Sequence, residues 1–212
     1  MTFVPPSSDR RPALLILDLQ VGLCGPGPSS LAPPLAEQTS DRGVVAAAAK
    51  LQQAAFASRV PVIQTRLAFA PGYFSQSNRT PRFSRYPGER LLQLDDAAAQ
   101  VVPDLRHPDA VVVTKGCVDP LVGSALPAML FANRVTDVLI GGIATNLAVE
   151  SAARHAADLG LRVCVVEDAC ASFTPEMHDL AIQKTLPLFA EIVSTAEAIA
   201  ALGEADHALT AR

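Results

Sequence analysis

Short, uninterrupted apolar segments alternate with longer segments of helical periodicity along most of the chain. Such apolar runs are typical of parallel strands that are covered on both faces. The stretch 136–170 shows the repeating unit: an apolar run, a turn at Gly141 and Gly142, an alanine-rich helix that ends at Gly160, and a second apolar run. The pattern predicts strands at 13–19, 60–67, 110–114, 138–140, 161–166 and 191–193, and helices at 43–58, 120–133, 147–159, 175–186 and 196–202.

This alternation predicts an α/β domain in which helices cover both faces of a parallel sheet. No internal repeat or linker divides the 212 residues, so we interpret 1–212 as one domain. We expect the tail at 203–212 to be loose. Ligands of such sheets bind beyond the C-terminal ends of the strands, where the strand order reverses.

Composition excludes several classes of protein. Half of the residues are apolar and 18% are charged, which does not fit a disordered chain. The net charge is −4 and no basic cluster could follow a phosphate backbone, so nucleic-acid binding is not expected. The apolar runs are too short to span a membrane, and the first residues lack an apolar signal core. The four cysteines lack metal or redox spacing, so we expect reduced thiols in a cytoplasmic protein.

The segment 68–89 has no clear periodicity but holds five of the ten aromatic residues and three arginines. A long irregular segment inside a compact domain is often functional. We interpret it as a lid over a pocket, with Tyr73 and Phe74 as substrate contacts; a dimer contact or a plain insertion would explain it as well. As a lid, its composition would suit a small polar or planar substrate, either neutral or anionic.

Polar residues lie at the ends of two of the apolar strands, Asp18 near the C-terminal end of the first and Lys115 directly after the third. The turn at 141–148 follows the fourth strand. All three positions fall on the same edge of a parallel sheet and can converge, although a charged residue at a strand end also simply reaches solvent. Free N–H groups where the next helix begins could lower the pKa of a thiol or hold an oxyanion. Thr145 or Asn146 could cap that helix. A strand–helix–strand connection with no catalytic role would have the same turn.

Together these segments resemble the isochorismatase-like cysteine hydrolases. The matching motifs are DLQ at 18–20, TKG at 114–116, GGIATN at 141–146, ESAARHAADLG at 150–160 and VVEDACAS at 165–172. The resemblance extends from about residue 13 to 202. It implies a three-layer α/β/α sandwich around a six-stranded parallel, Rossmann-like sheet. It also implies a homodimer or homotetramer.

The family mostly hydrolyses C–N bonds in amides, ureas and carbamoyl compounds with an Asp-Lys-Cys set. The resemblance gives Asp18 the role of proton acceptor for the thiol and Lys115 that of electrostatic support. It also implies a cis peptide between Ile143 and Ala144. The N–H groups of Ala144 and Ala148 would then form the oxyanion hole.

This sequence departs from the family at the nucleophile, because Ala148 stands where the family has cysteine. Alanine cannot act in covalent catalysis, so this chain is expected to be inactive by that route. Two explanations are open: a deliberate Cys-to-Ala substitution in an otherwise intact hydrolase, or natural loss. A natural loss would leave a protein that binds a metabolite or partner, or one that uses water activated by Asp18.

The remaining candidates are polar residues near these motifs. Cys117 could line the pocket or replace the missing nucleophile. Gln20 could hold the first loop or contact substrate, and Asn146 could cap a helix or contact substrate. The segment 68–89 contains no histidine, so we predict no catalytic metal. The first strand is not followed by a G-x-G-x-x-G motif, so we expect no dinucleotide and no other cofactor.

Overall fold

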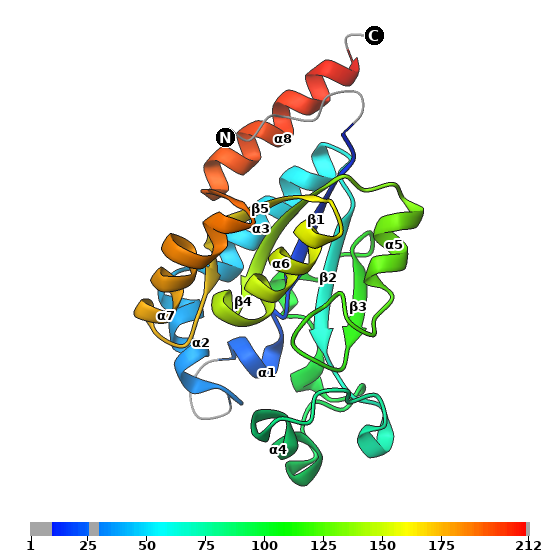
Figure 1. The fold of residues 1–212 in the computed structure, drawn as a ribbon, viewed down its shortest axis with the longest axis vertical. Helices are drawn as coiled ribbons and strands as arrows, with labels where there is room; N and C mark the ends of the chain where they lie inside the picture. Colours follow the sequence, from blue (N-terminus) through cyan, green and yellow to red (C-terminus); the bar gives the residue numbers. More distant parts are fainter. Residues whose placement is uncertain (1–9, 26–29, 211–212) are drawn as a thin grey trace.

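A parallel sheet forms the centre of the molecule (Figure 1), with the strand order β3-β2-β1-β4-β5-β6. The computed structural model describes residues 10–25 and 30–210, and only the backbone of 204–210. Every neighbouring pair of strands is parallel, which confirms the predicted sheet. The strands are β1 (Pro12–Leu17), β2 (Val62–Leu67), β3 (Val111–Lys115), β4 (Asp137–Ile143), β5 (Arg162–Ala171) and β6 (Glu191–Val193).

Helices cover both faces of the sheet and complete three layers (Figure 1). Residues 14 and 16 of β1 pack with α3 and α8, whereas residues 13, 15 and 17 pack with α5 and α6. Both faces of β1 are therefore buried, which explains its uninterrupted apolar sequence. The α-helices are α1 (Val21–Cys24), α2 (Pro33–Asp41), α3 (Val44–Ala57), α4 (Pro81–Glu89), α5 (Leu126–Ala132), α6 (Glu150–Asp158), α7 (Pro175–Leu180) and α8 (Thr195–Thr210).

Several predicted boundaries are wrong for local reasons. Gly141 and Gly142 do not end β4, because Gly142 lies at a bulge where a Cβ would come within 2.1 Å of the Leu17 carbonyl oxygen. Because glycine has no Cβ, the backbone of β4 can stay next to β1 at this point, and β4 continues to Ile143. The helix predicted at 120–133 begins at Leu126, with a proline in its first turn.

Other differences lengthen or add elements. Strand β5 continues beyond its predicted end at Val166 to Ala171, and helix α8 continues to Thr210, so the predicted tail is helical over most of its length. Helices α1 and α2 were not predicted, because their short segments lie in a region rich in glycine, proline and serine. No helix in the described ranges is long and apolar enough to cross a bilayer.

The segment that we predicted to be irregular, 68–89, contains the short helix α4. Phe83 and Tyr86 lie on one face of α4 and pack against Phe69 and Leu92 in a hydrophobic cluster of their own. Two prolines and several arginines obscured this amphipathic turn in the sequence. In Figure 1, α4 lies beyond the ends of the strand arrows, at the carboxyl edge of the sheet. The strand order reverses at this edge between β1 and β4.

Candidate active site

A buried ion pair lies at the carboxyl edge of the sheet. The Lys115 Nζ is 2.7 Å from Asp18 Oδ2, and the two side chains are 1% and 8% exposed. Lys115 ends β3 and Asp18 follows β1, so the pair spans the intervening strand β2. Thr65 of β2 donates a hydrogen bond of 2.8 Å to Asp18 Oδ1, and Lys115 also donates to the Val118 carbonyl. These partners fix both charged groups in a site with little water.

The turn after β4 provides the opposite wall of the site. The peptide bond between Ile143 and Ala144 is cis. A π-helical turn, η5 (Thr145–Val149), leads from it into α6. Ala144 and Ala148 are both buried, and both face the same cavity as Asp18 and Lys115. Ala148, the position that the resemblance gives to the nucleophile, therefore lines the same cavity as the ion pair.

Side chains outside the cavity hold this turn. The predicted helix cap by Thr145 or Asn146 is wrong, because Ala144 occupies the cap position and no side chain caps the turn. Thr145 Oγ1 instead lies 2.8 Å from Nδ1 of buried His178, and Asn146 Oδ1 accepts a hydrogen bond of 2.6 Å from Ser172. These contacts fasten the turn to α7 and to the end of β5.

His178 continues this network to two charged residues. Its Nε2 lies 3.2 Å from Glu167 Oε1, and Arg42 donates to the same oxygen. A proton on Nε2 leaves Nδ1 to accept from Thr145, which sets the tautomer. Burial lowers the pKa of His178, and the hydrogen bond to Glu167 offsets only part of this effect. Burial alone would raise the pKa of Glu167, but the hydrogen bonds from His178 and Arg42 bring it below its usual value.

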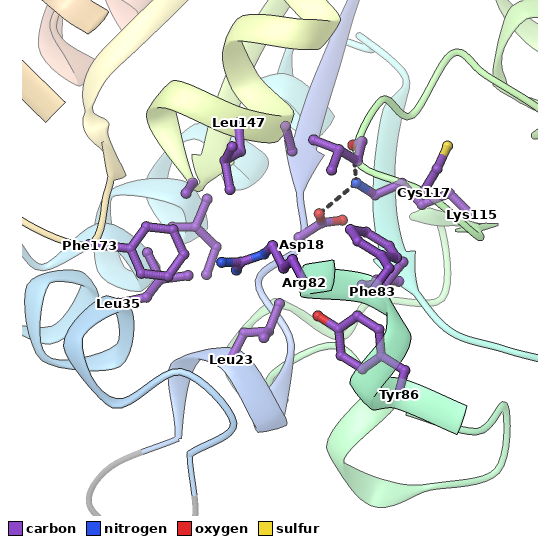
Figure 2. A pocket seen from close by; sticks show the side chains of 15 residues that line it. Asp18, Leu23, Leu35, Arg82, Phe83, Tyr86, Lys115, Cys117, Leu147 and Phe173 are labelled. Carbon is purple, nitrogen blue, oxygen red and sulfur yellow. Dashed lines mark hydrogen bonds and ion pairs between the residues drawn. The ribbon is translucent and has the colours of Figure 1, made fainter. Parts of the chain in front are cut away.

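The carboxyl-edge cavity between the ion pair, the turn and α4 is small, about 40 Å³ (Figure 2). A volume of this size holds a few water molecules, whereas typical ligand pockets measure several hundred Å³. Three charged side chains line it, and the remaining walls are largely apolar. The lining residues are Asp18, Leu23, Leu35, Leu67, Arg82, Phe83, Tyr86, Lys115, Cys117, Val118, Ile143, Ala144, Leu147, Ala148 and Phe173.

Comparison with known proteins assigns the family. The isochorismatase domain family matches residues 12–197. The isochorismatase family protein YecD of Escherichia coli O157:H7 is 30% identical over 204 residues, which cover 91% of this chain and 97% of YecD. This chain belongs to the isochorismatase family.

Solved structures of the isochorismatase family and of related hydrolases share the fold. A cysteine hydrolase from Pseudomonas syringae pv. phaseolicola 1448A has a TM-score of 0.80 and 25% identity, over 94% of this chain and 96% of that chain. N-carbamoylsarcosine amidase from Thermoplasma acidophilum has a TM-score of 0.68 and 22% identity, over 87% of this chain and 96% of that chain. The predicted α/β/α fold of the isochorismatase-like hydrolases is thus confirmed.

Four of the predicted substrate contacts of this isochorismatase-family chain lie outside the cavity. The amide of buried Gln20 is occupied by the N–H and carbonyl of Leu67 and by a further carbonyl, so it holds the first loop. Tyr73 donates its hydroxyl to a backbone carbonyl, and the side chain of Phe74 is 95% exposed. Asn146 contacts Ser172, as described above. Tyr73 and Phe74 were singled out as aromatic residues, but α4 places Phe83 and Tyr86 at the site instead.

Cys117 does line the cavity, but its thiol is turned elsewhere. Its Sγ donates to the carbonyls of Asp119 and Val122 at 3.3 and 3.5 Å, and Figure 2 shows the sulfur pointing away from Asp18. Burial raises the pKa of Cys24, Cys164 and Cys170 to about 12 in each case, which leaves almost no thiolate at neutral pH. Among the residues that the structure describes, the geometry therefore offers no cysteine that could take the role of the expected nucleophile.

Arg82 and Phe173 are cavity residues that sequence reasoning missed. Arg82 belongs to α4, and Phe173 follows β5 on the other side of the cavity. The arginine-rich, aromatic composition of 68–89 indicated a lid, but only the helical spacing of residues 82, 83 and 86 identifies the residues that face the site. No group of three or more His, Cys, Asp or Glu in the described part of the chain could hold a metal ion.

Proposed function

We propose that this chain has the framework of a cysteine hydrolase that cleaves a C–N bond in a small amide, urea or carbamoyl compound. It lacks only the nucleophile, because position 148 is alanine. The observation that carries the proposal is the shared cavity: the buried Asp18–Lys115 pair and Ala148 line the same small space at the carboxyl edge.

A cysteine at position 148 would complete the reaction. Its thiol proton passes to the Asp18 carboxylate, and the adjacent Lys115 ammonium stabilises the thiolate. The sulfur attacks the substrate carbonyl, and the N–H groups of Ala144 and of residue 148 hold the oxyanion. Collapse of this intermediate breaks the C–N bond, and Asp18 returns the proton to the leaving nitrogen. Asp18 then deprotonates the water that hydrolyses the thioester, which releases the acid and restores the thiol.

The test is to install the nucleophile with Ala148→Cys. The added sulfur projects into an existing cavity, so we expect the variant to fold. We expect its release of ammonia or amine, over a panel of small amides, ureas and carbamoyl compounds, to exceed that of the parent chain by at least about a thousandfold on its best substrate. Ala148→Ser is the matched control, because a hydroxyl of similar size is much harder to deprotonate.

Two outcomes would reject the proposal. If Ala148→Cys folds and hydrolyses nothing on the panel, the chain is better explained as a binding protein that retains the fold. If the parent chain itself turns over substrate as fast as the variant, an alternative in which Asp18 activates water directly is favoured.

A further inference from the structure

Arg82 gives the carboxyl-edge cavity an excess positive charge. Of the charged side chains that line it, Asp18 and Lys115 neutralise each other at 2.7 Å. Within the described ranges, no ion pair joins Arg82 to a carboxylate. The other walls of the cavity carry no charge. A cation at the rim of a mostly apolar cavity, with no counter-ion beside it, attracts an anion into that cavity.

The position of Arg82 suits it to hold such an anion. Its guanidinium carbon lies 4.7 Å from the ring centroid of Phe173, and Figure 2 shows the side chain reaching from α4 toward that ring. Stacking on an aromatic face orients the guanidinium plane but uses none of its five N–H donors. The planar fork therefore remains available for bidentate binding of a carboxylate.

We propose that Arg82 binds a carboxylate of the substrate, so that the substrate is a small amide, urea or carbamoyl compound that also carries a carboxylate. This inference rests on the proposed function, because it assumes that the C–N bond lies beside Ala148 and Asp18. Arg82 lines the cavity and is also exposed to solvent, so we place the carboxylate at the mouth of the cavity and the reacting group inside. The cavity of about 40 Å³ limits the reacting end to a few non-hydrogen atoms.

The same helix provides a matched control. Arg85 lies three residues after Arg82, does not line the cavity and pairs with Glu89 on the outer face of α4 at 3.1 Å. Replacing either arginine by glutamine removes one positive charge from the same helix. Only Arg82→Gln removes it from the cavity, so the comparison separates direct binding from a general change in charge.

The experiment uses the parent chain, in which Ala148 prevents covalent turnover. Binding of succinamate and of the neutral, nearly isosteric succinamide is measured by NMR titration, and the pair N-carbamoylglycine and N-carbamoylglycinamide is measured in the same way. We expect each carboxylate to bind at least about tenfold more tightly than its neutral partner. Arg82→Gln should abolish this preference and Arg85→Gln should retain it. Equal binding within both pairs, absent binding of both carboxylates, or a preference that survives Arg82→Gln would overturn the inference.

The two proposals can fail separately. If Ala148→Cys hydrolyses neutral amides and carboxylate-bearing amides equally well, with or without Arg82, the hydrolase proposal stands and the role of Arg82 is rejected. If Ala148→Cys is inactive but the parent chain shows Arg82-dependent carboxylate binding, the hydrolase proposal is rejected and the anion site remains. The thermal midpoints of both glutamine variants should match that of the parent chain, because both side chains are exposed.

Discussion

Two aspartates, one at each edge of the sheet, pair with basic side chains in different surroundings. At the carboxyl edge, Asp18 meets Lys115, whose side chain is 1% exposed. At the amino edge, Asp137 opens β4 and meets Arg162, which opens β5 and is 57% exposed. The guanidinium of Arg162 holds Asp137 with two hydrogen bonds and remains in contact with solvent. The Asp18–Lys115 pair is therefore buried, whereas the Asp137–Arg162 pair joins the first residues of two neighbouring strands and keeps its basic side chain in solvent.

The cavities beside the two ion pairs differ in volume, and the smaller cavity lies beside the more buried pair. The amino-edge cavity, lined among others by Asp137, Cys164 and Phe189, has a volume of about 840 Å³, against about 40 Å³ at the carboxyl edge. Ligands of parallel α/β sheets bind at the carboxyl edge, where the first turn of each following helix presents free N–H groups. A buried ion pair adds little or nothing to stability compared with apolar residues of the same size. The small cavity with the desolvated pair is therefore the better candidate for chemistry, and size is a poor guide here.

The largest expected difference between the edges is catalytic. In the Ala148→Cys background, Asp18→Asn should lower kcat/KM by about a hundred- to ten-thousandfold, because no other carboxylate lines the cavity to take the thiol proton. Asp137→Asn should leave kcat/KM within about twofold, because its contacts lie at the other end of the sheet. Steady-state kinetics on one substrate measure both. Similar losses in the two variants would contradict the distinction between the edges.

The two ion pairs should also differ in how much the loss of their basic residue destabilises the fold. Lys115→Met leaves the buried Asp18 carboxylate without its cation and should lower the free energy of unfolding by about 3–5 kcal/mol. Arg162→Met should lower it by less than about 1 kcal/mol, because Arg162 is largely exposed and Asp137 keeps Thr136 and Arg10. Urea denaturation monitored by circular dichroism measures both values.

The double variant Asp18→Asn/Lys115→Met checks the cause of the loss. It removes the uncompensated charge, so it should be more stable than Lys115→Met alone. A double variant that is less stable than Lys115→Met would show that packing, and not the buried charge, determines the effect.

The edges should differ again in their response to pH. The pKa of His178 is lowered mainly by burial, so below its ordinary value of 6.5 the unfolded chain binds a proton that the folded chain does not. Stability is therefore lost as the pH falls below 6.5. The pKa of Asp137 is also lowered, because the hydrogen bonds from Arg162 and Thr136 outweigh burial, and its contribution is lost only below 3.8.

The contribution of His178 can be measured from the free energy of unfolding between pH 7.5 and pH 5. The parent chain should lose stability over this range, and His178→Gln should lose less, because glutamine does not titrate. Asp137→Asn should keep the slope of the parent chain. Parallel curves for the parent chain and His178→Gln would show that other groups cause the slope.

From the sequence we could predict the cavity residues that lie at strand ends, but not those that lie on the short helix α4. Asp18 and Lys115 were found because each ends an apolar run, and a parallel sheet brings such ends to one edge. The position of Ala148 followed from the family motif around the turn. Arg82 could not be found in this way, because the helix of nine residues that orients it begins at one proline and contains another. Its orientation is set by the packing of Phe83 and Tyr86, which local propensity does not encode.

The smallest expected effect concerns the thiol beside the larger cavity. Cys164 lines the amino-edge cavity, but burial and the nearby carboxylates raise its pKa to about 12. At pH 7.5 only about one thiol in ten thousand or fewer is ionised, so iodoacetamide should leave Cys164 almost unmodified in the folded parent chain. In Ala148→Cys, by contrast, the new thiol beside Lys115 should react at least about a hundredfold faster than Cys164. Peptide mapping by mass spectrometry after timed alkylation measures both rates. Rapid labelling of Cys164 in the folded chain would mean that the large cavity opens to water and reagents, and the amino edge would then have to be reconsidered as a binding site.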